Sequence, residues 1–479
     1  MPSIGIIGSG FGALAVAITL LQDGHDDIRL WERSDRIGGV WRDNTYPGAA
    51  CDVPSALYSF SFEPYTGWES RYAHQPQILA YLRRTAAKYG VTPRVRTGAT
   101  VVGATYDEAH SQWEVALADG TTDRVDVLVS AVGQLSDPVL PPIPDIDRFQ
   151  GTAFHSARWD HAAPLSGTRI AVVGTGASAT QFVPHLADRA AELLVFQRTP
   201  SYILPRPDQR YGRLYQGAFR VVPGALRTER NAFFSLAEQF SRGLDDDTRA
   251  GEIIRALALA HLRLRVRDRE LRAALTPDYP VGCRRILFAN SFYPALTRPH
   301  VRLVTAAVDE VTEAGIVAGG VHHDVDAIVY GTGFDAQNFL SAMRIEGAGG
   351  RLLTDVWADG ARAHLGVHVP GFPNFFVAYG PNTNLGGGSI VYMLEAQARH
   401  IRDVLRRMRE GGHRSVTVTS EAAEGFDRAV QHRLERSVWG HCESWYRHPS
   451  GRITSNWPGN TRTYADATAR LKPEEFAWT

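Results

Sequence analysis

Cysteine and lysine are scarce in this sequence, and neither sign of charge is in excess. The three cysteines, Cys51, Cys283 and Cys442, lie far apart and show no CxxC spacing. They therefore predict neither a disulfide framework nor a zinc site, and they suit a reducing cytoplasm. Only Lys88 and Lys472 are lysine, and 51 Lys+Arg residues balance 51 Asp+Glu residues. This balance gives no indication of nucleic acid or an anionic membrane as a partner.

A long uninterrupted apolar run is also missing. The stretch from Ile4 to Leu21 contains several glycines and no basic leader. It predicts a strand, a loop and a helix rather than a signal peptide or a membrane span. With 479 residues, 44% of them hydrophobic, the chain is long enough for two or three domains. Nothing in the sequence indicates the oligomeric state.

A glycine-rich loop follows the first expected strand. Residues 3–7 predict a buried strand, and Gly8-Ser9-Gly10-Phe11-Gly12-Ala13 then opens an apolar helix. In this G-x-G-x-x-[G/A] pattern the first glycine turns the chain, the second lets a pyrophosphate approach, and the helix N-terminus supplies amide donors. Glu32 ends the next expected strand, 24 residues beyond Gly8. Its carboxylate can accept hydrogen bonds from a ribose diol, which predicts FAD. The alternative is a glycine turn with a solvent-facing glutamate.

The same arrangement recurs later in the chain. An expected strand over residues 169–173 is followed by Gly174-Thr175-Gly176-Ala177-Ser178-Ala179, a helix and another strand. Arg198 stands 24 residues after Gly174, at the offset where Glu32 follows Gly8. A guanidinium pairs with a phosphate through two parallel hydrogen bonds, so this fold predicts NADPH rather than NADH. The alternative for Arg198 is an ordinary surface arginine.

Another repeated element is expected to close each of the two folds. Residues 126–133 and 326–333 share a framing aspartate and glycine around an apolar centre, which predicts a buried strand and a glycine turn. We therefore expect an α/β protein with two Rossmann-like dinucleotide-binding domains, the second inserted in the first, together with a helical insertion. The expected boundaries are 1–140 and 335–479 for the FAD-binding domain, 141–206 and 282–334 for the NADPH-binding domain, and 207–281 for the helical insertion.

Two longer patterns identify a family. Residues 149–160, Phe-Gln-Gly-Thr-Ala-Phe-His-Ser-Ala-Arg-Trp-Asp, fit F-x-G-x3-H-x3-W-[P/D] at every specified position. Residues 39–52 fit G-x-W-x4-[F/Y]-P-G-x3-D, ending at Asp52. On these patterns the whole chain resembles the Baeyer–Villiger monooxygenases, which are flavin monooxygenases of class B. Residues 379–384 and 456–459 resemble the hydroxyacetophenone-type subgroup.

The resemblance implies further cofactor contacts and a catalytic pair. Gly282-Cys283-Arg284-Arg285 resembles the family's G-x-K-R segment, so Arg285 takes the place of the catalytic arginine and Asp52 that of the active-site aspartate. Arg284 would join Arg198 and Thr199 around the 2′-phosphate, and Trp445 would pack near the nicotinamide. The flavin contacts would fall at Val40, Trp41, Asp52, Tyr58 and Val101, and Gln181 is a further expected cofactor contact.

The implied reaction is the insertion of one oxygen atom of O2 beside a ketone carbonyl, giving an ester or lactone. NADPH reduces FAD, a C4a-peroxyflavin forms, and a fixed cation stabilises the anionic adduct. We expect Arg285 to be that cation and Asp52 to position it, the alternative for each being a structural salt bridge. His155 is expected to couple domain position to NADP binding, with a plain linker histidine as the alternative. No metal is expected.

Competing functions share parts of this pattern. An enzyme that oxygenates nitrogen or sulfur has both nucleotide folds but does not require Arg285. A pyridine nucleotide–disulfide reductase would need a cysteine pair beside the flavin, where Cys51 stands alone, and a non-catalytic scaffold would not need Asp52 and Arg285. The chain departs from the family at Ala50, where relatives often carry arginine, and at the bare loop 386–388, so the ketone itself is not predicted.

Overall fold

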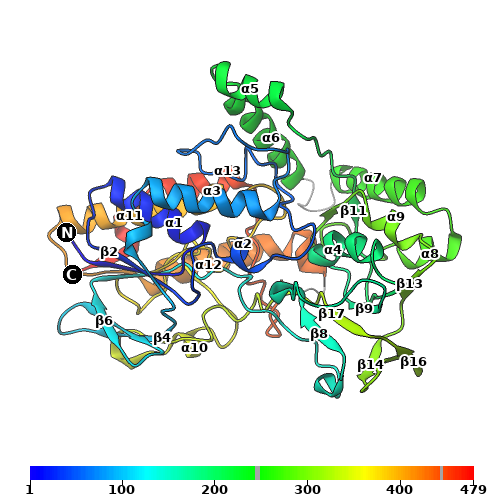
Figure 1. The fold of residues 1–479 in the computed structure, drawn as a ribbon. Helices are drawn as coiled ribbons and strands as arrows, with labels where there is room; N and C mark the ends of the chain where they lie inside the picture. The colour runs from blue at the N-terminus through cyan, green and yellow to red at the C-terminus, as the bar shows by residue number, and fades with distance from the viewer. Residues whose placement is uncertain (243–248, 443–445) are drawn as a thin grey trace.

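Two parallel five-stranded sheets form the framework of the molecule (Figure 1). Four strands have the same order in both sheets, whereas the outer strand beside the closing strand comes last along the chain in the first sheet and first in the second. The computed structural model describes residues 1–242, 249–442 and 446–479. The first sheet has the order β19-β7-β1-β2-β3, and the second has the order β13-β10-β9-β17-β8. The first comprises β1 (Ile4–Ile7), β2 (Ile28–Glu32), β3 (Val95–Thr97), β7 (Val127–Ser130) and β19 (Phe375–Val377). The second comprises β8 (Thr152–His155), β9 (Arg169–Val173), β10 (Glu192–Phe196), β13 (Val301–Val304) and β17 (Ala327–Tyr330).

Each sheet is built around a strand, a glycine loop and a helix. The strands β1 and β9 lead into α1 (Phe11–Gln22) and α4 (Ala177–Ala187), respectively. The strands β7 and β17, which the repeated sequence element predicts, are buried along their whole length and lie beside β1 and β9. A strand covered on both faces needs apolar side chains throughout, which explains their continuous apolar sequence. The predicted pair of Rossmann-like folds is confirmed.

Further elements cover the first sheet. The helix α11 (Ile390–Glu410) packs against α1, and both contribute to one large apolar core. A four-stranded sheet of β18 (Arg344–Glu346), β4 (Val101–Asp107), β5 (Gln112–Leu117) and β6 (Thr122–Val125) belongs to a second core that includes Trp31 of β2.

Other helices and short sheets lie in both folds. Further helices are α2 (Val40–Asp43), α3 (Gln75–Lys88), α9 (Phe292–Leu296), α10 (Leu353–Val356), α12 (Ser420–Glu435) and α13 (Thr461–Ala469). Short sheets are formed by β14 (Val308–Val311), β15 (Gly315–Ala318) and β16 (Val321–Asp324), and by β20 (Val416–Val418) and β21 (Phe476–Trp478).

Among the described residues 205–242 and 249–286, four helices stand between the short paired strands β11 (Ile203–Leu204) and β12 (Leu287–Phe288). They are α5 (Arg213–Val221), α6 (Ala225–Arg242), α7 (Arg249–Arg265) and α8 (Arg269–Ala274), and α5 and α6 project from the top of the molecule in Figure 1. The described end of α6 meets the glycine loop 386–388, where Ser241 Oγ donates to the carbonyl of Gly387 at 3.0 Å. A Cβ atom at Gly387 would lie 2.9 Å from the Phe240 ring, so close packing explains this bare glycine.

Two antiparallel segments connect the folds. The amide of Val139 donates to the carbonyl of Gly333 at 3.1 Å, and the amide of Asp335 donates to the carbonyl of Asp137 at 2.9 Å. The outgoing and returning chains therefore lie side by side. The segment 149–160 is more than this connection, because its residues Thr152–His155 form β8, the outer strand of the second sheet.

The cysteines differ from their prediction. Cys283 and Cys442 form a disulfide with Cα atoms 5.5 Å apart, whereas Cys51 is free and buried. The prediction of no disulfide is wrong because the fold joins residues 159 positions apart, a proximity that spacing alone cannot show.

Within residues 1–242, 249–442 and 446–479, no helix is long and apolar enough to cross a membrane. The same ranges contain no cluster of three or more His, Cys, Asp or Glu residues suited to a metal ion.

Candidate functional site

The two glycine loops have matching geometry. Gly8 and Gly174 have φ values of 110° and 102°, which favour glycine. A Cβ atom at Gly8 would lie 2.6 Å from the Ala131 carbonyl oxygen, and one at Gly174 would lie 2.6 Å from that of Gly331. Both loops therefore turn tightly against the strand that closes their fold. The remaining predicted loop residues follow directly and begin the helices: Ser9, Gly10, Phe11, Gly12 and Ala13 in the first fold, and Thr175, Gly176, Ala177, Ser178 and Ala179 in the second.

The first loop has room for a pyrophosphate. A Cβ atom at Gly10 would meet nothing nearer than the Gly39 Cα atom at 3.6 Å. The helix α1 begins at the next residue and has no side-chain cap, so its first amides are free to donate to an anion. This geometry fits a dinucleotide lying across the end of β1.

Glu32 lies at the end of β2 in a buried network. The Ser9 hydroxyl donates to its carboxylate, the Ser34 amide donates to Oε1 at 2.9 Å, and Arg42 Nη1 lies 2.9 Å from Oε1. The Glu32 and Arg42 side chains are only 5% and 8% exposed. The carboxylate thus stands beside the glycine loop in a fixed position. Sequence reasoning missed Arg42, whose spacing from Glu32 gives no signal.

The predicted flavin contacts gather into one aromatic cluster. Trp41 Nε1 donates to the Tyr58 hydroxyl at 3.0 Å, and the Tyr58 ring also meets the Phe11 ring at a centroid distance of 5.0 Å. Val40 begins α2, so it lies directly beside Trp41. Val101 lies apart from this cluster, in the core that contains Trp31 next to Glu32. The structure therefore brings Val40, Trp41 and Tyr58 together and places Val101 on the Glu32 side of the site.

Arg285 and Asp52 form the pair that the sequence predicts. Arg285 Nη2 lies 3.5 Å from Asp52 Oδ2, and the arginine side chain is 52% exposed against 10% for the aspartate. Burial raises the pKa of Asp52, and the positive charge of Arg285 opposes that shift. Burial also disfavours the charge on Arg285, but Asp52 raises the pKa of the guanidinium overall. The buried Asp52 carboxylate thus holds the Arg285 guanidinium in place, while about half of the arginine side chain stays accessible.

Gln181 of α4 holds the loop that carries Asp52. Its Nε2 atom donates to the Ala50 carbonyl at 3.0 Å and lies 3.4 Å from Asp52 Oδ1, while its Oε1 atom accepts from the Ala50 amide at 3.2 Å. The Tyr46 hydroxyl also donates to Oε1 at 3.1 Å. A residue of the second fold therefore fixes the active-site loop of the first. The backbone of Ala50 supplies these contacts, so the missing arginine side chain does not weaken them.

Tyr279 links two of the segments predicted to hold the 2′-phosphate. Arg198 is exposed just beyond β10, followed by Thr199, and it has no ion-pair partner among the described residues. The Arg284 guanidinium lies 5.4 Å from the centre of the Tyr279 ring, and the Tyr279 hydroxyl donates to the Pro200 carbonyl at 2.8 Å. Tyr279 thereby connects Arg284 to the segment after Arg198. No sequence signal pointed to this tyrosine.

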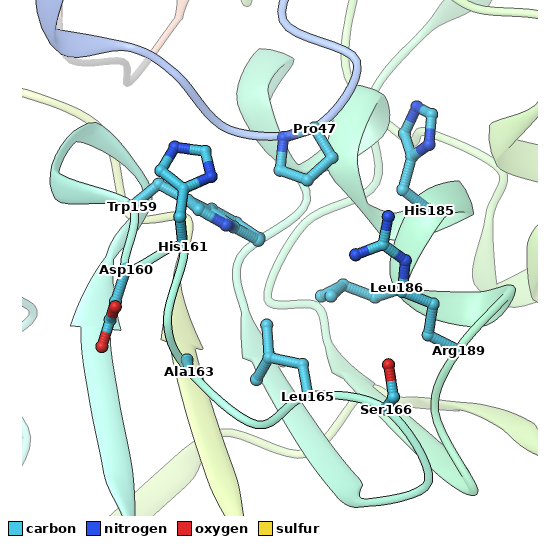
Figure 2. A pocket seen from close by; sticks show the side chains of 10 residues that line it. All are labelled: Pro47, Trp159, Asp160, His161, Ala163, Leu165, Ser166, His185, Leu186 and Arg189. Carbon is cyan, nitrogen blue, oxygen red and sulfur yellow. The ribbon is translucent and has the colours of Figure 1, made fainter.

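The segment with the histidine motif touches the first fold. His155 is buried, and its Nδ1 atom accepts from the Ala157 amide at 3.1 Å. Burial lowers the pKa of His155, which favours the neutral ring. Farther along, His161 Nε2 lies 2.9 Å from Thr45 Oγ1. A cavity of about 160 Å³ lies at this junction. Figure 2 shows its lining, in which Pro47 of the first fold lies near Trp159, His185 and Arg189.

The predicted nicotinamide contact, Trp445, lies outside the described residues. Its neighbour Tyr446 is buried near Arg285, since burial raises the pKa of Tyr446 to about 12 while the Arg285 charge opposes the shift. Tyr379 shows the same pair of influences on its pKa and has a φ of 62°. Positive φ at a bulky residue is costly and clusters at functional sites. These two tyrosines therefore border the Arg285 site.

Known proteins share the family and the fold. Residues 2–215 match the family described as flavin-binding monooxygenase-like. The chain is 40% identical over 99% of its length to a Baeyer-Villiger monooxygenase of Streptomyces coelicolor, of which 92% is covered. It is also 40% identical over 99% of its length to a Baeyer-Villiger monooxygenase of Pseudomonas aeruginosa, of which 90% is covered. Among solved structures, an oxidised steroid monooxygenase bound to NADP has a TM-score of 0.89 and 30% identity, covering 100% of this chain and 99% of that one. A closed structure of cyclohexanone monooxygenase has a TM-score of 0.90 and 26% identity, with the same coverage.

Proposed function

This chain belongs to the Baeyer–Villiger monooxygenase family, and we propose that Arg285, positioned by Asp52, is the cation that its reaction requires. The enzyme is an NADPH-dependent flavoprotein that inserts one oxygen atom of O2 beside a ketone carbonyl. Ketone, O2, NADPH and a proton give an ester or lactone, NADP⁺ and water. The observation that carries the assignment is the half-exposed Arg285 guanidinium held 3.5 Å from the buried Asp52 carboxylate.

The two nucleotide folds divide the cofactors between them. FAD, when bound, accepts hydride from NADPH and activates O2. The open space at Gly10, the fixed Glu32 carboxylate and the aromatic cluster of Trp41 and Tyr58 fit FAD in the first fold. The exposed Arg198 guanidinium fits the 2′-phosphate of NADPH in the second.

Arg285 would stabilise negative charge on the reacting oxygen atoms. A guanidinium stays protonated at every pH the enzyme meets, and here Asp52 raises its pKa further. A preorganised charge of this kind costs no rearrangement at the moment of reaction. The exposed half of the side chain would face the ketone, and the buried carboxylate would keep it there.

Gln181 would make this arrangement depend on the position of the second fold. Its amide contacts both Asp52 and the Ala50 backbone, so a shift of α4 would move the loop that holds Arg285. The contact of His161, directly after the histidine motif, with Thr45 is a second link between the folds. We therefore assign His155 a role in coupling the folds rather than in proton transfer. The reducing cytoplasm remains our proposed location, with O2 and a small ketone as the partners.

The assignment is tested with Arg285→Ala, Arg285→Lys and the matched control Arg302→Ala. Arg302 lies on the edge strand β13, is likewise about half-exposed, at 58%, and pairs with Glu192 of β10. We expect Arg285→Ala to bleach its flavin with NADPH but to form almost no ester, Arg285→Lys to recover part of the yield, and Arg302→Ala to behave as the wild type. A normal ester yield from Arg285→Ala would overturn the assignment.

A further inference from the structure

The segment that carries Arg285 is held by the C-terminal part of the chain. Trp439, in the short helix η5 (Val438–His441), donates from its indole nitrogen to the Gly282 carbonyl at 3.1 Å. Arg447 Nη2 donates to the Gly440 carbonyl at 2.7 Å and so fixes the same short helix. Tyr446 lies near Arg285 itself. Residues of the C-terminal segment both before and after positions 443–445 therefore lie close to the Arg285 loop.

The Cys283–Cys442 disulfide is the covalent part of this contact. Cys283 precedes Arg284 and Arg285 directly, and Cys442 follows η5 directly. The bond therefore joins the Arg284–Arg285 loop of the second fold to the C-terminal segment, which belongs to the first fold. It lies within two residues of both Arg284 and Arg285.

We propose that Cys283 and Cys442 are a thiol–disulfide modification site, reduced by a dithiol, whose state sets how firmly the Arg284–Arg285 loop is held for NADP(H). One thiolate of the dithiol attacks a sulfur of the bond and forms a mixed disulfide, releasing the other protein thiolate. The second thiol of the reductant then displaces the remaining cysteine, so two electrons and two protons pass to the protein and the reductant becomes a disulfide. A small-molecule disulfide reverses the sequence.

The consequence falls on the NADPH half of the site. Without the bond, the loop keeps the Trp439–Gly282 hydrogen bond but loses the crosslink that opposes its movement. Arg284 stacks on Tyr279, which bonds to Pro200 beside Thr199, so movement of this loop reaches the 2′-phosphate residues. The FAD contacts at Glu32 and Tyr58 share no partner with either cysteine. Reduction should therefore weaken NADP(H) binding and leave FAD in place.

Access and selectivity both favour this pair. Cys442 is 8% exposed and Cys283 is 3% exposed, so a reductant would reach Cys442 first through local opening of η5. Cys51 is the third cysteine and is unpaired. Burial raises the pKa of its thiol to about 12, so Cys51 stays protonated and does not compete in exchange. In a reducing cytoplasm the pair would be open, and a shift to oxidising conditions would close it.

The test compares the FAD-loaded full chain after treatment with reduced or oxidised dithiothreitol. The redox state is counted by alkylating the denatured protein, with three reactive thiols expected when reduced and one when oxidised. We expect the dissociation constant for NADP⁺, measured by titration calorimetry, and the KM for NADPH to rise by about fivefold or more on reduction. The flavin content should not change, and reoxidation should restore both constants.

Variants separate the crosslink from a general effect of the reagent. Cys283→Ser and Cys442→Ser should each show the reduced-state constants and ignore dithiothreitol, whereas Cys51→Ser should keep the response. The proposal is overturned if oxidised and reduced wild-type protein bind NADP⁺ alike, if oxidation leaves three reactive thiols, or if Cys442→Ser still responds. The wild-type comparison decides the matter even if a variant fails to fold. A redox response without ester formation would fault the proposed function and not this site.

Discussion

The two nucleotide folds share the order of four strands but differ in the charged residue that stands 24 positions after the first loop glycine. In the first fold Glu32 is buried and already engaged by Ser9, Ser34 and Arg42. In the second, Arg198 is exposed and has no ion-pair partner among the described residues. In the proposed assignment, the FAD carboxylate is therefore fixed by protein contacts, whereas the arginine proposed for NADPH is exposed to its ligand. This difference is what a resident FAD and an exchanging NADPH require.

Replacing Glu32 should have the largest effect. Glu32→Gln would remove the carboxylate that balances buried Arg42, and breaking a buried ion pair costs about 3–5 kcal/mol. We expect a loss of folding free energy near the lower end of this range, since Asp43 also pairs with Arg42, together with loss of bound flavin. Chemical denaturation and the flavin-to-protein absorbance ratio measure both. Glu114→Gln, which breaks the exposed pair with Arg124, is the matched control and should change little.

Acid should act on the first fold in particular. His368 and His400 are buried beside each other with Nε2 atoms 2.9 Å apart, packed against the first fold's large core. Burial lowers the pKa of His400 to about 4 and that of His368 well below its ordinary value. The unfolded chain takes up protons first, from about pH 6.5 downward, so stability is full above pH 6.5 and falls toward pH 4. For His400, the difference between a pKa of about 6.5 in the unfolded chain and about 4 in the folded protein corresponds to a loss of about 3 kcal/mol below pH 4.

Denaturation at several pH values checks this, with His400→Gln as the comparison. That variant keeps a hydrogen-bonding side chain but cannot titrate, so its stability should depend less steeply on pH. Equal pH dependence in both proteins would assign the acid sensitivity to other groups.

Replacing Arg198 should affect binding without affecting stability. Arg198→Ala should raise the KM for NADPH by about 10- to 100-fold, the size expected for a lost charge-assisted pair, and leave the KM for NADH nearly unchanged. The melting temperature should not move, because the side chain is exposed and unpaired. Arg220→Ala, an exposed arginine on α5, serves as the control. A KM for NADPH that stays at the wild-type value would place the 2′-phosphate elsewhere.

The smallest effect concerns the aromatic cluster. Trp41→Phe keeps the ring packing but loses the hydrogen bond to the Tyr58 hydroxyl, at a cost of about 1 kcal/mol. Tyr58→Phe removes the same bond from the other side. The double variant should therefore lower the melting temperature of the flavin-loaded protein by less than the sum of the two single decreases. A decrease equal to that sum would show that the hydrogen bond does not contribute.

Much of this arrangement could be predicted because it depends on local sequence. The glycine loops, Glu32, Arg198 and the closing strands follow from short patterns whose geometry is set by neighbouring residues. Contacts between distant segments could not be predicted in this way. Arg42, Tyr279 and the Cys283–Cys442 bond depend on how loops of different folds meet, and a single sequence carries no signal for such proximity.

The histidine motif shows the same limit. Its spacing identified the family, but its place as the outer strand of the second sheet follows only from the pairing of β8 with β17. Gln181 is similar: it is predicted as a cofactor contact, and no sequence signal indicated that its amide also contacts Ala50 and Asp52.

The most direct test of the whole account is oxygen transfer to a ketone under isotopically labelled O2. We expect the wild-type enzyme, given FAD, NADPH and a panel of cyclic and open-chain ketones, to form an ester or lactone that carries one labelled oxygen atom for each NADPH consumed. Labelled products from amines or sulfides alone, with every ketone returned unchanged, would contradict it.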